Sequence, residues 1–122
     1  MIGPTEAEFM GQIIEMAQLR GWRVHHTRPA WTGKGWRTPI QGDPGFPDLV
    51  LVRKRGKRVR VIFAELKSDK GRLTNEQQEW IRLLEGCKGV ESYIWRPRIW
   101  EGILAILGYQ EEIKNKEENE HG

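Results

Sequence analysis

The sequence predicts an α/β domain in which a central mixed sheet of about four strands is flanked by helices. Two apolar runs, at residues 49–52 and 59–64, lie on either side of a glycine turn and are typical of neighbouring interior strands. Two further segments begin with helix N-cap signals, at Thr5 and Thr74. The predicted order of elements is αβββαβα, which 122 residues accommodate as one domain.

The composition is that of a globular protein, with 38% hydrophobic and 30% charged residues and a net charge of +3. The apolar runs are far shorter than the roughly 20 residues that span a bilayer, and the N-terminus lacks a signal-peptide pattern. We therefore expect a cytoplasmic protein without membrane contact. A single cysteine, Cys87, excludes an internal disulfide and has no partners at zinc-ligand spacing. We expect it to be buried at a helix end.

The first predicted helix begins after Thr5, its expected N-cap, with Glu8 as capping-box partner, and ends near Gly21. One apolar stripe follows the helical period and consists of Phe9, Met10, Ile13, Ile14 and Ala17. Glu6 falls on the side of this stripe, whereas Glu8 projects from the opposite side. An inward acid at a helix start needs a partner, which a metal site would supply. The alternative is a wet carboxylate that the helix dipole favours.

Residues 22–28 alternate and include β-branched side chains, which predicts a strand. Residues 29–47 are rich in Gly and Pro and predict a long loop, which carries two tryptophans and the cations Lys34 and Arg37. Loops of this length in a compact domain are usually functional. These side chains could stack on bases and contact phosphates. Alternatively, Trp31 and Trp36 cover the edge of the core or a dimer contact.

The two apolar runs form a hairpin whose register can be predicted. Gly56 suits the first central position of a two-residue type II′ turn, which places Arg55 opposite Arg58. Counting back along both strands, Asp48 lies opposite Glu65, with Cβ atoms about 5 Å apart. A slip of one residue would send the two acids to opposite faces of the sheet.

Lys67 points to the same side as Glu65, because side chains alternate along a strand. Two close carboxylates repel each other unless a cation lies between them. Paired carboxylates beside an amine are also how a protein holds a divalent ion next to a phosphate, and oxygen ligands favour Mg²⁺ or Mn²⁺ over zinc. The three residues Asp48, Glu65 and Lys67 therefore predict a metal-dependent nuclease site.

Thr74 begins the second predicted helix, which ends at Gly86, and Gln77 completes its capping box. Gln77 also lies on the inward side of this helix, where it could reach the neighbourhood of the predicted site. The alternative is that it only caps the helix.

The C-terminal part of the chain predicts a strand at residues 90–95, which Pro97 ends, and a helix at residues 99–107. We expect residues 1–108 to form the domain. Residues 109–122 are expected to form a charged tail or an extension of the last helix.

Positive charge is concentrated at residues 53–60, which contain six cations and no acid, whereas residues 109–122 carry five acids and two lysines. Such a run is either a solvated turn or, because it belongs to the hairpin that carries the acids, a surface that binds nucleic acid. The DNA-binding candidates are Lys34, Arg37, Lys54, Arg55, Lys57, Arg58, Lys70 and Arg72.

A set of motifs along residues 5–107 resembles the VRR-NUC domain of the PD-(D/E)xK nuclease superfamily. The motifs are Glu6, Gly45-Phe46-Pro47-Asp48, Glu65-Leu66-Lys67, Thr74 with Gln77, and Trp95-Arg96-Pro97. One departure is Arg98-Ile99, where similar proteins often place an acid, and it lies away from these motifs. The resemblance implies a restriction-endonuclease-like core.

The resemblance also implies roles for particular residues. The implied metal ligands are Glu6, Asp48, Glu65 and the backbone carbonyl of Leu66, for Mg²⁺ or in its place Mn²⁺. Lys67 would orient or deprotonate the attacking water, and Gln77 would support the catalytic site.

Stand-alone, phage-type domains of this family resemble the archaeal Holliday-junction resolvases, which act in DNA repair. The resemblance thus implies an Mg²⁺-dependent, structure-specific DNA endonuclease that works as a homodimer on branched DNA such as four-way junctions. One alternative is a flap-cutting or nicking endonuclease. Another is a DNA-binding module with a vestigial site, against which the intact acids and lysine count.

Overall fold

The computed structural model describes residues 3–26, 30–31, 36–37 and 42–108. The elements along the chain are α1 (Glu6–Leu19), β1 (Arg23–His26), β2 (Ala30–Trp31), β3 (Trp36–Arg37), β4 (Leu49–Arg55), β5 (Arg58–Leu66), α2 (Asn75–Glu85), β6 (Val90–Trp95), the 3₁₀ turn η1 (Pro97–Ile99) and α3 (Trp100–Leu107). No helix among these residues is both long and apolar enough to cross a membrane.

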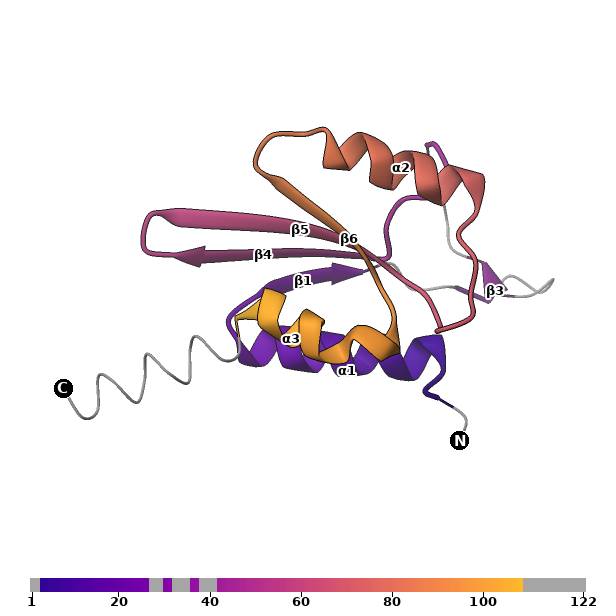
Figure 1. The fold of residues 1–122 in the computed structure, drawn as a ribbon, viewed down its shortest axis with the longest axis horizontal. Helices are drawn as coiled ribbons and strands as arrows, with labels where there is room; N and C mark the ends of the chain where they lie inside the picture. The colour runs from indigo at the N-terminus through magenta and orange to yellow at the C-terminus, as the bar shows by residue number, and fades with distance from the viewer. Residues whose placement is uncertain (1–2, 27–29, 32–35, 38–41, 109–122) are drawn as a thin grey trace.

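The main sheet has four strands in the order β1-β4-β5-β6. The pairs β1–β4 and β4–β5 are antiparallel, whereas β5 and β6 are parallel and are connected through α2. Helix α2 lies on one side of the sheet and α1 and α3 lie on the other (Figure 1). This architecture confirms the predicted α/β class with a mixed, four-stranded sheet.

The prediction of a loop at residues 29–47 is partly wrong, because β2 and β3 form an antiparallel pair within this segment. Each strand has only two residues, which is too short to show the alternation of apolar and polar residues by which longer strands are predicted. The domain boundary expected after residue 108 leads into a tail that lies outside the described residues.

The β4–β5 hairpin has the predicted register. Gly56 has a φ of 59° and Lys57 has a negative φ, as a type II′ turn requires. Arg55 pairs with Arg58 at the turn, and Leu49 pairs with Ala64 at the other end. The residues one step further, Asp48 and Glu65, therefore meet at the end of the hairpin that is remote from the turn.

The core lies mainly between the sheet and the pair α1 and α3. The predicted stripe of α1 faces it, with Phe9, Ile13 and Ala17 fully buried and the other two members partly buried. Leu49, Leu51, Ile62, Ala64 and Leu66 meet this stripe from the two central strands.

The predicted helix starts are confirmed. The Thr5 hydroxyl accepts a hydrogen bond from the Glu8 N–H, and α2 begins with a complete capping box of Thr74 and Gln77. The expected burial of Cys87 is wrong. It lies exposed in the turn that connects α2 to β6.

Candidate active site

The two predicted acids lie together at the end of the central strands. Asp48 directly precedes β4, and Glu65 is the penultimate residue of β5. The Leu66 N–H donates a hydrogen bond of 2.8 Å to Asp48 Oδ2. Because the N–H and C=O of one strand residue point to the same neighbouring strand, the Leu66 carbonyl also faces the side of Asp48.

The environment of this pair disfavours two negative charges. Glu65 is only 2% exposed, and its Oε2 is buried without a hydrogen-bond partner. Burial, then the charge of Asp48 and a hydrogen bond with it, raise the pKa of Glu65 to about 8. Burial also raises the pKa of Asp48, against the opposing effect of the Leu66 N–H. The chain therefore places a fully buried and a half-buried carboxyl side by side, which disfavours the ionisation of both.

Lys67 is the cation that the chain itself supplies. Its Nζ lies 4.0 Å from Glu65 Oε1, and its side chain is 14% exposed. Its charge lowers the pKa of both acids, but the lowering is smaller than the effect of burial. The backbone N–H of Lys67 donates to the Trp95 carbonyl at 3.0 Å, which ties the end of β5 to β6.

Glu6 is exposed, which agrees with the alternative of a solvated carboxylate at the helix start. Glu6 is in the first turn of α1, and solvent reaches its side chain there although it lies on the side of the helix that carries the apolar stripe. Its charge nevertheless raises the pKa of both Asp48 and Glu65, which places it on the side of the site. Among the described residues, no three His, Cys, Asp or Glu side chains are close enough to form a metal cluster by themselves.

Gln77 is used by the helix cap. Its Oε1 accepts a hydrogen bond of 2.9 Å from the Thr74 N–H, and its own N–H donates to the Thr74 hydroxyl at 3.1 Å. Its backbone lies against Gly45, three residues before Asp48, because a Cβ on that glycine would approach the Gln77 nitrogen to 2.8 Å.

The segment before Asp48 packs against α2, a contact that the sequence did not predict. Gly45 has a φ of 93°, and a Cβ there would lie 2.6 Å from the Glu76 carbonyl carbon. Phe46 packs edge-on against Phe63 and Trp80, at centroid distances of 5.9 and 5.1 Å. The Trp80 indole N–H donates to the Pro44 carbonyl at 2.9 Å. A glycine three residues before the acid was the available signal for this close approach.

These features coincide with a known family. The family model described as "VRR-NUC domain" matches residues 22–97, which is more than half of the chain. The chain belongs to the VRR-NUC family. Searches of curated proteins and of solved structures found no match.

Membership of the VRR-NUC family implies a nuclease of the PD-(D/E)xK type. The matched region includes Asp48, Glu65 and Lys67, whereas Glu6 lies before it. The donor set also fits a divalent cation, since Glu65 has a buried oxygen without a hydrogen-bond partner and the nearby charge of Asp48 raises its pKa.

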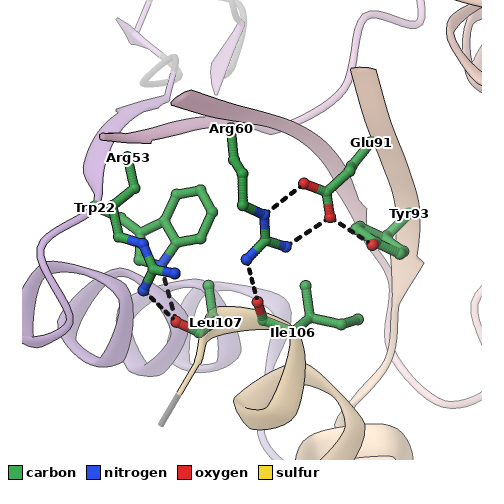
Figure 2. Close-up of polar contacts among 7 residues, drawn as sticks. All are labelled: Trp22, Arg53, Arg60, Glu91, Tyr93, Ile106 and Leu107. Atoms are coloured by element: carbon green, nitrogen blue, oxygen red, sulfur yellow. Dashed lines mark hydrogen bonds and ion pairs between the residues drawn. The ribbon is translucent and has the colours of Figure 1, made fainter. Parts of the chain in front are cut away.

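The far end of the hairpin uses its arginines differently (Figure 2). Arg53 donates to the Leu107 carbonyl at 2.9 Å, and its guanidinium lies 4.7 Å from the centre of the Trp22 ring. Arg60 lies 5.0 Å from the same ring and forms an ion pair of 2.6 Å with Glu91. Arg53 and Arg60, from the basic run of this VRR-NUC chain, are thus bound to the fold.

The remaining cations of the run lie near the hairpin turn. Lys54, Arg55, Lys57 and Arg58 are exposed. Arg55 also donates to the Arg20 carbonyl at 3.0 Å. The turn is the opposite end of the hairpin from the carboxylates, roughly 20 Å away for seven residues of strand. The basic run thus belongs to the hairpin that carries the acids, as predicted, but lies at its other end.

The other DNA-binding candidates divide into two groups. Lys70 and Arg72 are exposed in the segment that directly follows Lys67. Lys34 lies outside the described residues, and only the backbone of Arg37 is described, in β3.

Proposed function

We propose that this VRR-NUC protein is an Mg²⁺-dependent, structure-specific DNA endonuclease that hydrolyses phosphodiester bonds in branched DNA such as four-way junctions. The observation that carries the proposal is the close pair of half-buried Asp48 and fully buried Glu65, with Lys67 beside it. A fold that holds two carboxyls this close, one of them fully buried, is disfavoured unless a cation joins them.

The chain offers four oxygen ligands for Mg²⁺ or Mn²⁺. Asp48 and Glu65 supply carboxylates, and the Leu66 carbonyl faces the same side as Asp48. Glu6 is the further ligand, from the first turn of α1. When bound, the cation would neutralise charge on the phosphoryl oxygens and acidify a bound water.

Lys67 acts on the water that attacks the phosphorus. Its ammonium group lies 4.0 Å from Glu65 and is partly open to solvent, so it can donate to a water or to a phosphate oxygen. Gln77 supports the catalytic site through its cap, because the start of α2 holds Gly45 and the segment that leads to Asp48.

DNA contacts near the catalytic site come from Lys70 and Arg72, which follow Lys67 in the chain, and Lys34 and Arg37 are further DNA-binding candidates. Lys54, Arg55, Lys57 and Arg58 contact the phosphate backbone at a second place, roughly 20 Å away. A homodimer would present one site to each of two symmetric strands, as paired cuts in a junction require. As a phage-type domain, the protein would act in DNA repair in the cytoplasm.

The second candidate is a flap-cutting or nicking endonuclease, which uses the same site without requiring a dimer. A DNA-binding module with a vestigial site is disfavoured because the acids, the lysine and their geometry are all intact.

Cleavage of labelled four-way junction, flap and duplex DNA tests the proposal, with Mg²⁺, Mn²⁺ or EDTA. We expect symmetric cuts in the junction, no cutting in EDTA, and a dimeric mass in solution. Asp48→Ala and Lys67→Ala should each reduce the cleavage rate by at least about 1000-fold, because each removes a group of the reaction centre.

Matched controls remove an exposed acid or lysine elsewhere. Glu101→Ala in α3 and Lys88→Ala after α2 should cleave within about twofold of the wild type. Normal Mg²⁺-dependent cleavage by Asp48→Ala or Lys67→Ala would refute the assignment. Preference for a flap over the junction would favour the second candidate.

A further inference from the structure

The turn that follows Lys67 is held by an arginine from another part of the chain. Arg96 comes directly after β6, and its Nη1 donates hydrogen bonds of 2.7 Å to the carbonyls of both Ser68 and Gly71. Residues 68–71 form a turn in which the Gly71 N–H bonds to the Ser68 carbonyl at 3.1 Å. One guanidinium nitrogen therefore bridges the first and last residues of this turn.

Two further bonds join the same segments. The Lys67 N–H donates to the Trp95 carbonyl at 3.0 Å, and the Arg98 N–H donates to Asp69 Oδ1 at 2.9 Å. The chain from residue 95 to residue 98 thus contacts the segment from Lys67 to Gly71 along its length. The two Arg96 bonds and the bond to the Asp69 carboxylate each involve an ionised group, and bonds of that type are stronger than those between neutral groups.

The turn also packs on the Lys67 side chain. A Cβ on Gly71 would lie 3.4 Å from Lys67 Cδ and 3.0 Å from Ser68 Oγ. Gly71 is the residue whose carbonyl Arg96 holds. A displacement of the turn would therefore displace the stem that carries the Lys67 ammonium group toward Glu65.

We propose that Arg96 is a positioning residue for Lys67. It holds the 68–71 turn against the Lys67 side chain and so keeps the ammonium group beside the carboxyl pair. This role rests on the proposed nuclease function. Arg96 is half-buried, which distinguishes it from the exposed cations that we assign to DNA contact, and it donates to two backbone carbonyls beside Lys67.

The test compares Arg96→Ala with Arg98→Ala, which removes the same charge two residues later. The Arg98 side chain is exposed, and its contact with the Asp69 carbonyl is long, at 3.5 Å. The Arg98 backbone bond to Asp69 stays in both variants. Single-turnover cleavage with the enzyme in saturating excess over DNA, the Kd for DNA in EDTA, and amide hydrogen exchange of residues 67–72 are measured for each.

We expect Arg96→Ala to lower the single-turnover rate by about 10- to 100-fold, because small displacements of a reacting group have effects of that size. Its Kd should stay within about threefold of the wild type, as a lost DNA contact would instead weaken binding. Exchange in residues 67–72 should rise by at least about tenfold. Arg98→Ala should leave the rate and the exchange unchanged.

Arg96→Lys separates positioning from charge, and it keeps the test decisive if Arg96→Ala does not fold. Lysine keeps the positive charge but lacks the rigid pair of N–H groups on one planar nitrogen. We expect a rate about three- to tenfold below the wild type. A wild-type rate in Arg96→Lys, or a weaker Kd without a slower step in Arg96→Ala, would overturn the proposal. If the wild type cleaves no DNA, the proposed function fails, whereas the exchange measurement still decides whether Arg96 holds the turn.

Discussion

The two ends of the β4–β5 hairpin bury charged groups in opposite ways. At the turn-distal end, Asp48 and Glu65 have raised pKa values, and a Glu65 oxygen is buried without a partner. Toward the turn, Arg53 and Arg60 lie against the Trp22 ring and donate to carbonyls at the end of α3. The same two strands therefore carry an incomplete charge cluster, Asp48 and Glu65, in which a buried oxygen lacks a partner, and a completed cluster, in which Arg53 and Arg60 bond to acceptors of the fold.

The completed cluster gives Arg53 and Arg60 of the basic run a structural role. The last carbonyls of a helix have no partners within it and carry partial negative charge, so guanidinium groups are suitable donors there. Arg60 additionally forms two hydrogen bonds with Glu91, whose pKa is lowered mainly by that contact. Partnered charges of this kind stabilise the fold, whereas the unpartnered oxygen of Glu65 indicates where a ligand is expected.

The largest effect on stability is expected at the completed end. Arg53→Ala should lower the free energy of unfolding by about 3 kcal/mol, because it removes donors to the Leu107 and Arg20 carbonyls and the packing on Trp22. Lys54→Ala, the exposed neighbour of equal charge, should change it by less than about 0.5 kcal/mol. Urea unfolding measures both. Equal effects of the two variants would mean that the arginine network does not stabilise the fold.

The second effect concerns pH at the incomplete end. The folded protein keeps a proton on Glu65 up to a pKa of about 8, whereas the unfolded chain releases it near 4.5. The stabilisation associated with that proton is complete below pH 4.5 and is lost as the pH rises toward 8. In EDTA, Glu65→Gln should therefore become more stable than the wild type with rising pH, by about 2–3 kcal/mol at pH 8.

Thermal unfolding of both proteins between pH 5 and 8 measures this difference. Mg²⁺ should reduce it, because a cation favours the ionised carboxylates of the wild type. A difference that does not change with pH would show that Glu65 carries no raised pKa.

A smaller effect is expected from the support of Asp48. Gly45→Ala should lower the free energy of unfolding by about 2 kcal/mol, because it combines an unfavourable φ of 93° with overlap against the Glu76 backbone. Cleavage should also fall by more than about tenfold, since Asp48 would shift. Gly42→Ala is the matched control, because its φ is also positive, at 138°, but nothing lies within 4 Å. If Gly42→Ala is equally impaired, strain rather than the fit against α2 explains the effect.

The sequence allowed prediction of those features that depend on neighbours a few residues apart. Thr5 and Thr74 marked both helix starts, and Gly56 specified the turn and the pairing that follows from it. The opposition of Asp48 and Glu65 was a consequence of that pairing. Glu6 shows the limit, since the helical period gave its direction but not whether solvent reaches the end of the helix.

What the sequence by itself determined is thus the order of elements, the hairpin register and the acids that this register brings together. Only the tertiary structure decided the partners of Arg53 and Arg96, which bond to carbonyls 54 and 28 residues away. It also decided that Gly45 lies against α2. The physical reason is that caps and turns are satisfied within one stretch of chain, whereas a free carbonyl at a helix end accepts whichever donor the packing of distant segments brings to it.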